Sequence, residues 1–464
     1  MFLNRRAELD LLEKHFASSN AELFVLYGRR RVGKTELIVQ FCQEKRAIFF
    51  VSDLGSEISL RAAFSTAINA VLFGPGRMDA VYSSWEALFQ TLGQAAQEER
   101  LVVVIDEFPY MVAAHPPLAS ILQKAWDQTL KNTKIMLILC GSYIGMMEET
   151  VLGYKAPLFG RRTAQYLLEP MSFKNARLFF PSLLNQDQVR AYAVYGGMPA
   201  YLQTIDLNKS LNDNIRDHIL SRGSYLYDEA RFILQQELRE PRNYFAILQA
   251  IAAGKTRLNE IKQASGLEGA TAYLNTLQQL HLVERVVPVT EKQPQKSRRG
   301  IYRLKDHYLR FWFRYIHPNR SQLERGGAQT VLQNQVLPEI DHYSSLAFEE
   351  ICQQYFWLEG LSGKFTFLPL NVGRWWNASE EIDLAVIGEK DVILVECKWS
   401  NRPVGKNVLA DLERKAEIFH RILGDRKTQY ALCSRSGFTS QLIEMLATRS
   451  EVLLLDLNQI LKQS

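Results

Sequence analysis

Apolar and polar residues follow a regular pattern over the first third of the chain. Uninterrupted apolar runs at residues 23–26, 101–105 and 135–139 have the length of strands, and the first of them leads through a short loop into a segment with helical periodicity. Strands that are apolar on both sides are typical of a parallel sheet covered by helices on both faces. The pattern therefore predicts an α/β domain in this part of the chain.

The middle of the chain has a different order of elements. From Asn243, three short amphipathic segments are broken near Gly254 and Gly266, and a β run follows Leu282. Three helices followed by a hairpin predict a winged helix. The third helix, at residues 269–280, would be the recognition element, but it is almost uncharged, which is unfavourable for phosphate contacts.

Near the C-terminus, charged residues interrupt an apolar hairpin. Glu396 and Lys398 lie two apart in the second predicted strand, so they share a face, and Asp383 lies on the preceding strand, where it can meet them. Charges inside an apolar strand cost free energy unless they are paired or bind a metal. These residues thus predict either a divalent-metal site or an ion pair that involves Lys398.

Length and composition indicate a multidomain protein. The 464 residues exceed what one core organises, and 47% hydrophobic and 23% charged residues are ordinary globular values. No apolar stretch approaches the length of a membrane span and the first residues lack an apolar signal core, so we expect a cytoplasmic protein without a membrane partner.

The cysteines are few and scattered. They form no CxxC pair, and their spacing fits neither a disulfide framework nor a zinc site, so we expect free thiols. The five positions are Cys42, Cys140, Cys352, Cys397 and Cys433.

Positive charge is concentrated in the middle of the chain. The net charge is only +5, but residues 241–330 hold 15 Lys+Arg and 6 Asp+Glu, a local excess of +9. Three of these basic residues, Lys296, Arg298 and Arg299, cluster at the tip of the predicted wing. The excess indicates either a solvated face on a purely structural winged helix or an electrostatic footprint for nucleic acid, bound through the wing.

A phosphate-binding loop follows the first apolar run. Gly28 and Gly33 allow the tight turn that directs backbone N–H groups toward phosphates, Lys34 reaches the β and γ phosphates, and Thr35 offers its hydroxyl to magnesium. The strand before the loop and the helical pattern after it are the context that this motif requires. The predicted nucleotide contacts are Gly28, Arg29, Arg30, Arg31, Val32, Gly33, Lys34, Thr35 and Glu36.

The second apolar run delivers two carboxylates to its C-terminal end, where ligands bind in open α/β sheets. We expect Asp106 to hold magnesium through water and Glu107 to polarise the attacking water. A glutamate directly after the aspartate favours hydrolysis over nucleotide binding alone.

Three further residues have two interpretations each. Ser142, after the third apolar run, either senses the γ phosphate or caps the next helix. Arg161 and Arg162, after Gly160, either neutralise charge in the transition state or form surface ion pairs.

Six motifs in order resemble the archaeal-type ATPase family, P-loop ATPases of the AAA+/STAND kind. They are FLNRRAELDLL, YGRRRVGKTEL, VVVIDEFPYM, LILCGSYIGMMEE, PLFGRRT and YGGMPAYL. The resemblance covers about residues 1–235 and implies ATP as the nucleotide, a RecA-like parallel sheet, and a small helical lid that contains Gly196, Gly197, Met198 and Pro199.

The resemblance extends into an aromatic stretch, GIYRLKDHYLRFWFRYIHPNRS, which is similar to the domain of unknown function usually fused behind these ATPases. The helical spacing of Tyr308, Phe311, Trp312 and Tyr315 favours a core contact between domains over base stacking.

Asp383 followed by Glu396-Cys397-Lys398 resembles the PD-(D/E)XK nuclease superfamily over about residues 335–464. Glu349 matches the helix glutamate that many members add, although no proline precedes Asp383. The resemblance implies Mg²⁺ or Mn²⁺ held by Glu349, Asp383 and Glu396, with Lys398 placed to orient or deprotonate water.

We therefore predict an α/β multidomain architecture. A RecA-like P-loop NTPase parallel sheet occupies residues 1–165, a helical lid 166–235, a winged helix 236–330 and a PD-(D/E)XK nuclease-like α/β domain 331–464. The predicted function is ATP hydrolysis coupled to DNA binding or metal-dependent DNA cleavage. The alternative is a STAND-like switch, in which ATP controls assembly into a homo-oligomer and an inactive nuclease-like domain serves for interaction.

Overall fold

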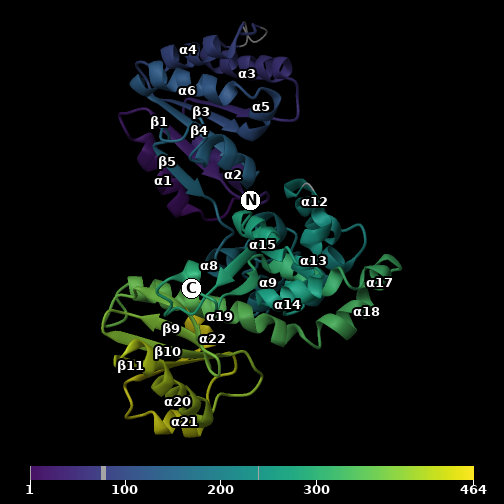
Figure 1. The fold of residues 1–464 in the computed structure, drawn as a ribbon, viewed down its shortest axis with the longest axis vertical. Coiled ribbons are helices and arrows are strands. Elements are labelled where there is room, and N and C mark those ends of the chain that lie inside the picture. The colour runs from purple at the N-terminus through teal and green to yellow at the C-terminus, as the bar shows by residue number, and fades with distance from the viewer. Residues whose placement is uncertain (1, 75–79, 239, 464) are drawn as a thin grey trace. The chain divides into compact units, whose positions relative to one another are not determined.

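The computed structural model describes residues 2–74, 80–238 and 240–463 (Figure 1). Contacts divide the chain into two compact units, Met1–Pro170 and Met171–Ser464. The predicted boundary after residue 165 falls inside strand β5 (Ala164–Leu167), which belongs to the first unit. The predicted lid from residue 171 onward, the winged helix and the nuclease-like segment lie in the second unit, and the four-part division stays a prediction.

The first unit is built on a parallel sheet of five strands in the order β2-β3-β4-β1-β5. The predicted apolar runs are strands β1, β3 and β4, each slightly longer than expected, so the predicted parallel sheet is confirmed. The strands are β1 (Glu22–Tyr27), β2 (Ala47–Val51), β3 (Leu101–Asp106), β4 (Ile135–Gly141) and β5.

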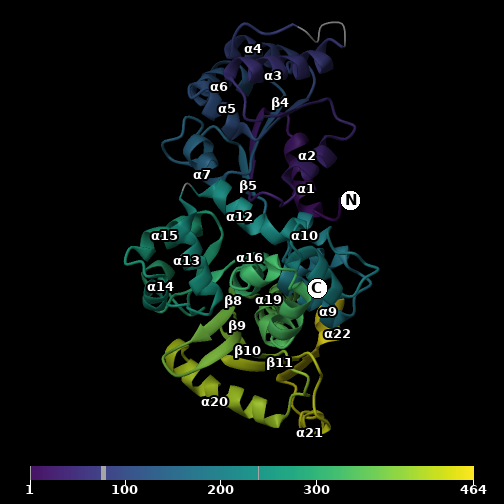
Figure 2. The ribbon, with the colours of Figure 1, turned by 90° about the vertical axis from the view of Figure 1, so that its right-hand side faces the viewer.

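Helices cover both faces of this sheet (Figure 2). Helices α3 (Glu57–Leu72), α4 (Trp85–Ala95), α5 (Phe108–Ala114) and α6 (Leu118–Gln128) lie on one face, and α1 (Arg6–Phe16) and α2 (Lys34–Cys42) lie on the other. Helix α7 (Ile144–Met147) and a π-helical turn at Glu148–Leu152 follow β4.

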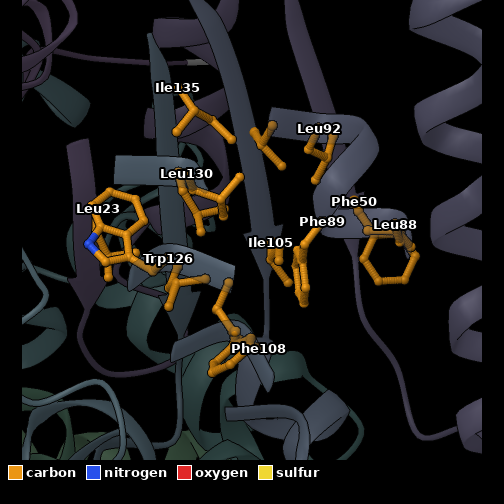
Figure 3. Close-up of a cluster of buried hydrophobic side chains, with 14 of the residues drawn as sticks. Leu23, Phe50, Leu88, Phe89, Leu92, Ile105, Phe108, Trp126, Leu130 and Ile135 are labelled. Atoms are coloured by element: carbon orange, nitrogen blue, oxygen red, sulfur yellow. The ribbon is translucent and has the colours of Figure 1, made fainter. Parts of the chain in front are cut away.

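Alternate strand residues form the core under α3 to α6. Figure 3 shows Leu23, Ile105 and Ile135 from three strands in one buried cluster with Leu88 and Leu92 of α4 and Trp126 of α6. Successive residues of a strand point to opposite faces, and the intervening residues are buried as well. Burial on both faces explains why these strands are uninterrupted apolar runs in the sequence.

The second unit begins with helical segments and ends in a mixed sheet. Its helices before the sheet are α8 (Phe173–Ala176), α9 (Asn185–Tyr195), α10 (Pro199–Leu202), α11 (Leu211–Ile215), α12 (Tyr225–Glu237), α13 (Pro241–Ala252), α14 (Leu258–Ser265), α15 (Ala270–Gln279), α16 (His307–Phe311), α17 (Arg320–Glu324), α18 (Ala328–Val331) and α19 (Ile340–Leu361). Gly197 lies before α10, where an added Cβ would be 1.9 Å from the Met171 carbonyl oxygen, so only glycine fits this approach.

The sheet of the second unit has the order β12-β11-β10-β9-β8. Strands β10 to β12 are parallel, whereas β8, β9 and β10 are antiparallel. Helix α19 packs on one face and α20 (Lys406–Leu423) on the other (Figure 2). The remaining elements are β8 (Asn371–Trp376), β9 (Glu381–Ile387), β10 (Asp391–Lys398), β11 (Lys427–Ser434), α21 (Ser440–Met445), β12 (Val452–Asp456) and α22 (Leu457–Gln463).

Helices α13, α14 and α15 are followed by an antiparallel hairpin, β6 (Val283–Val286) with β7 (Ile301–Leu304). This is the predicted order of elements, while the identity of the segment as a winged helix stays a prediction. The connection between the two strands is partly held in place: the Val289 N–H donates to the Arg374 carbonyl of β8 at 2.8 Å. Lys296 and Arg298, farther along the connection, are exposed.

The predicted core role of the aromatic stretch is confirmed. Tyr308, Phe311, Trp312 and Tyr315 are all buried. The Trp312 indole Nε1 donates to the Tyr227 carbonyl of α12 at 2.7 Å. Buried and packed in this way, these rings are not available for base stacking.

A charged cluster joins three elements of the second unit. Asp341 of α19 accepts from Arg190 of α9 at 2.7 Å and pairs with Arg435, just after β11, at 2.8 Å. Burial by itself raises the pKa of Asp341, but hydrogen bonds from Arg435 and Arg190 outweigh it, so the pKa lies below its ordinary value. The ionised Asp341 therefore stabilises the fold.

We predict that Asp341→Asn destabilises the protein by about 1–2 kcal/mol at pH 7, a value reduced because the side chain is about one-third exposed. A carboxyl group whose pKa is lowered in the folded state stabilises the protein fully above its unfolded-state pKa, which is near 3.9 for aspartate. This stabilisation is lost as the pH falls through the lower pKa of the folded state. The difference between variant and wild type, measured by urea unfolding, should therefore shrink in acid. Glu324→Gln, which removes an exposed pair with Arg320, is the control and should have a much smaller effect.

Candidate functional site

The loop between β1 and α2 has the geometry of a phosphate-binding loop. Gly28 has φ 154°, and a Cβ there would lie 2.5 Å from the Leu168 carbonyl oxygen. Gly33 has φ 92° and directly precedes Lys34, the first residue of α2. Side chains at either glycine would disturb the turn that presents the N-terminus of α2, where backbone N–H groups favour phosphate.

Lys34, Ser142 and Glu107 form a chain of contacts at the ends of three strands. The Lys34 ammonium donates to the Gly28 carbonyl at 2.9 Å and to the Ser142 hydroxyl at 2.8 Å. The Ser142 hydroxyl donates to Glu107 Oε1, and the Ser142 N–H donates to Oε2 of the same carboxylate at 3.0 Å. Strand β4 lies between β1 and β3, so its end places Ser142 between the P-loop and the acidic pair.

The structure separates the two interpretations of Ser142. Helix α7 begins after Tyr143, which makes no side-chain cap, and the Ser142 hydroxyl faces Glu107 instead. Glu107 has φ 55°, a conformation that residues other than glycine rarely adopt and that is common at functional sites. The capping interpretation is thus not what the structure shows, and the phosphate-sensing role stays a prediction.

Thr35 and Asp106 form a pair suited to magnesium. The Thr35 hydroxyl donates to Asp106 Oδ2 at 2.6 Å, while Asp106 Oδ1 accepts from the Glu107 N–H at 3.0 Å. Thr35 is exposed and Asp106 is buried. A hydroxyl and a carboxylate placed together beside a phosphate cradle are the ligands that magnesium uses in nucleotide sites, so the residues fit Mg²⁺ with a nucleotide.

The other residues predicted to contact nucleotide lie on or near this loop. Arg29 and Val32 are buried, Arg30 donates to the Tyr110 hydroxyl, and Arg31 and Glu36 are exposed.

Arg161 and Arg162 have partners away from the loop. Arg161 pairs with Asp127 at 3.1 Å, and Arg162 donates to the Leu152 carbonyl at 2.9 Å. These contacts match the ion-pair interpretation for Arg161, and a role for either arginine in neutralising phosphate charge stays a prediction.

A second group of charged side chains lies at the C-terminal sheet. Glu349 comes from α19, Asp383 from β9, and Glu396 and Lys398 from β10. Lys398 Nζ lies 2.5 Å from Glu396 Oε1, and Asp383 Oδ2 accepts from the Cys397 N–H at 2.8 Å. The four residues that the sequence singled out are therefore neighbours.

The carboxylates of this group interact unfavourably. Burial, followed by the charge of Asp383, raises the pKa of Glu349 well above its usual range, and burial together with Glu396 raises the pKa of Asp383. Two carboxylate oxygens, Glu349 Oε2 and Glu396 Oε2, are buried and accept no hydrogen bond. An unsatisfied carboxylate oxygen is a ligand that a hard divalent cation prefers, but among the described residues the oxygens of Glu349, Asp383 and Glu396 do not all lie within 4.8 Å of one another.

Two basic side chains beside this group were not predicted from the sequence. Lys415 of α20 lies 3.6 Å from Glu396 Oε2 and 3.0 Å from Asp411, and Arg374 of β8 lies 3.6 Å from Glu349 Oε2. The available signal was weak: α20 is an amphipathic helix that follows the β10 motif, and amphipathicity does not indicate that one of its lysines faces Glu396.

Comparisons with known proteins agree with the N-terminal site. Residues 2–205 match the family described as an ATPase domain predominantly from Archaea. Residues 186–304 match a domain of unknown function, and residues 312–415 match a family described as archaea bacterial proteins of unknown function. An uncharacterized protein of Methanocaldococcus jannaschii, MJECL04, is 33% identical over 442 residues, which cover 94% of this chain and 96% of that protein.

The chain belongs to the archaeal-type P-loop ATPase family. Another relative, the uncharacterized ATP-binding protein MJ0423 of the same organism, is 52% identical over 46 residues, 10% of this chain and 78% of that protein. Among solved structures, the Walker-type ATPase paby2304 of Pyrococcus abyssi has a TM-score of 0.52 at 20% identity over 68% of this chain and 96% of that chain. This likeness shows the shared fold.

Family membership supports ATP binding and hydrolysis by this archaeal-type ATPase. The two C-terminal families are of unknown function, so the winged-helix and nuclease-like resemblances stay predictions. Within the described parts of the chain, no helix is long and apolar enough to span a membrane.

We predict that Lys34→Ala abolishes nucleotide binding, because its ammonium lies at the mouth of the phosphate cradle. Binding of a fluorescent ATP analogue measures this directly. Lys45→Ala, which removes a half-buried partner of the exposed Glu13 in the same unit, is the control and should bind normally.

Glu107→Gln should bind ATP with unchanged affinity. Its rate of hydrolysis should fall by a factor of about 100 or more, because the amide cannot accept a proton from water. Phosphate release under single-turnover conditions separates hydrolysis from binding. Glu149→Gln, at an exposed position of the same unit, serves as the control. Turnover in Glu107→Gln equal to wild type would remove Glu107 from the catalytic role.

Proposed function

We propose that this archaeal-type ATPase couples ATP hydrolysis to metal-dependent cleavage of DNA by its C-terminal domain. The observation that supports the second activity best is the pair of buried, hydrogen-bond-free oxygens of Glu349 and Glu396 beside Asp383 and Lys398. Native proteins rarely leave such oxygens unsatisfied, and carboxylate oxygens are ligands that a hard divalent cation prefers. A single ion shared by these carboxylates would require their oxygens to move closer together than they lie in this structure.

In the ATPase site, the chain supplies positioning groups. The P-loop N–H groups and Lys34 would hold the β and γ phosphates, and Thr35 with Asp106 would hold Mg²⁺, which neutralises phosphate charge when bound. Glu107 would orient the attacking water and accept its proton. Ser142 holds the Glu107 carboxylate through its hydroxyl and its N–H, so the strand end that would face the γ phosphate would also orient the base.

In the C-terminal domain, Glu349, Asp383 and Glu396 would hold Mg²⁺ or Mn²⁺, ions that prefer carboxylate oxygens. When bound, the ion would activate water and neutralise phosphate charge. The Lys398 side chain is 40% exposed while its ammonium touches Glu396. It is therefore placed to orient a water or to contact a phosphate that arrives from solvent.

The basic middle of the chain supports DNA as the partner. Residues 241–330 carry an excess of +9, and the exposed Lys296 and Arg298 lie on the connection between β6 and β7. Arg299 is less available because it pairs with Glu291 at 2.8 Å. Phosphate contacts would come mainly from Lys296 and Arg298, since α15 is uncharged.

One observation favours a second function. Lys398 and Lys415 lie near Glu396, and Arg374 lies near Glu349, so these two carboxylates are balanced by cations of the protein without a metal. Lys415 also pairs with Asp411, and Arg374 also pairs with Glu381. Such balance would suit an inactive interaction domain in a STAND-like switch that assembles copies of the chain in response to ATP. The metal test below separates the two functions.

We predict that Mn²⁺ stabilises the wild-type protein and supports cleavage of DNA. At one hundred times its dissociation constant, a ligand of the folded state contributes about 2.7 kcal/mol, which is visible as a rise in melting temperature. Asp383→Ala should lose both the rise and the cleavage, but keep ATP hydrolysis, because that magnesium is held by Thr35 and Asp106. Asp391→Ala, at the opposite end of β10, is the matched control and should keep both.

If Mn²⁺ neither raises the melting temperature nor supports cleavage of single- or double-stranded DNA, with or without ATP, the ion-pair domain of the alternative function is supported instead. Cleavage that survives in Asp383→Ala would locate the nuclease activity elsewhere.

We also predict a steep salt dependence of DNA affinity. Each neutralised phosphate adds about 0.9 to the slope of log affinity against log salt, so Lys296→Ala with Arg298→Ala should lower the slope by about 1.8. Arg299→Ala alone should change it less, because Glu291 already neutralises that arginine. Fluorescence anisotropy at several salt concentrations measures the slope, and absence of binding at low salt would make the segment structural.

A further inference from the structure

Three cysteines that are far apart in the sequence meet inside the second unit. Cys352 lies in α19, Cys397 in β10 and Cys433 in β11, and their sulfur atoms all lie within 4.8 Å of one another. Cys352 and Cys433 have 0% relative exposure and Cys397 has 9%. All five cysteines of the chain are free thiols, as predicted, but the sequence spacing gave no sign of this group.

The group is held in place by regular structure. Cys397 and Cys433 are direct partners in the parallel pairing of β10 with β11, and Cys352 approaches from the helix that covers this face of the sheet. Neighbouring residues of β10 alternate between faces. Cys397 therefore faces α19, whereas Glu396 faces α20, whose Lys415 it meets.

The spacing is close to that of a metal–thiolate site. With metal–sulfur bonds of about 2.3 Å, sulfurs around one ion are separated by about 3.8–4.0 Å, so small side-chain adjustments bring the three sulfurs into range. Over residues 2–74, 80–238 and 240–463, no histidine or carboxylate joins the three sulfurs in one such group. A set of sulfur ligands alone selects soft ions and rejects Mg²⁺, Mn²⁺ and Ca²⁺.

We propose that Cys352, Cys397 and Cys433 bind one soft d10 metal ion, zinc or cuprous copper, that cross-links α19, β10 and β11. On binding, the three sulfurs form bonds to the ion and their thiol protons pass to solvent. The ion would be structural. It would fix the helix that carries Glu349 and the strand that carries Glu396, and it is independent of whether the carboxylates cleave DNA.

The test uses the full chain, purified under reducing, oxygen-free conditions, stripped with a chelator and then exposed separately to Zn²⁺, Cd²⁺ and Cu⁺. We expect one ion per chain by elemental analysis after desalting, thiolate-to-metal charge-transfer absorption with Cd²⁺, and a higher melting temperature. Cys433→Ser should lose the ion. Cys42→Ser, which removes a half-buried thiol of the first unit, is the matched control and should keep it.

The carboxylates Glu349, Asp383 and Glu396 allow a test of which residues bind the soft ion. Asp383→Ala and an excess of Mg²⁺ should leave Cd²⁺ uptake unchanged, because hard oxygen ligands and soft sulfur ligands select different ions. Uptake that depends on Asp383 and not on Cys433 would assign the ion to the carboxylates and overturn the proposal.

Two further outcomes would overturn the proposal. In the first, the wild-type protein has all five thiols reduced and still takes up no more of any of the three ions than Cys433→Ser does. In the second, protein isolated without oxygen contains a disulfide between any two of the three cysteines. Should Cys433→Ser fail to fold, X-ray absorption on the metal-loaded wild type decides: we expect a shell of sulfur at about 2.3 Å, and a shell of oxygen or nitrogen alone contradicts the proposal.

Discussion

The cost of burying charge governs both candidate sites of this chain. A charged group removed from water is tolerated only where partners or an ion compensate it. In the first unit the buried Lys34 ammonium has two carbonyls and the Ser142 hydroxyl. In the second unit, Glu396 has Lys398 and Lys415, but one of its oxygens still accepts no hydrogen bond. The first set of contacts is complete, and the second leaves one carboxylate oxygen without a hydrogen bond.

Helix α19 connects most of the polar structure of the second unit. Asp341, near its start, joins Arg190 and Arg435. Glu349 and Glu350 are adjacent in sequence and therefore point in directions about 100° apart, one toward the carboxylate group and the other toward His307, at 2.9 Å. Cys352 lies one turn after Glu349 and meets the other sulfurs. A single long helix thus sets the positions of four separate polar groups.

The ATPase site owes its layout to strand order. Because β4 lies between β1 and β3, Ser142 bridges Lys34, which would bind phosphate, and Glu107, which would activate water. A change at the γ phosphate that moved Lys34 would therefore alter the surroundings of Glu107 through one hydroxyl. Through this contact, a bound nucleotide could change the orientation of the Glu107 carboxylate.

Local geometry could be predicted from the sequence because it depends on neighbouring residues. The glycines of the P-loop, the acidic pair after β3 and the apolar runs that became buried strands all follow from short-range rules of backbone conformation and strand alternation. The same alternation predicted that Glu396 and Lys398 share a face. The spacing of the aromatic residues from Tyr308 to Tyr315 correctly predicted a core contact.

Contacts between distant elements were decided only by the tertiary structure. Strand order placed Ser142 beside Glu107, the docking of α20 brought Lys415 to Glu396, and the pairing of β10 with β11 under α19 assembled the three cysteines. None of these neighbours is encoded in a local period, because periodicity gives the face on which a residue lies and not the element that packs against that face. The sequence therefore determined which chemistry each segment carries, and the tertiary structure decided which segments meet.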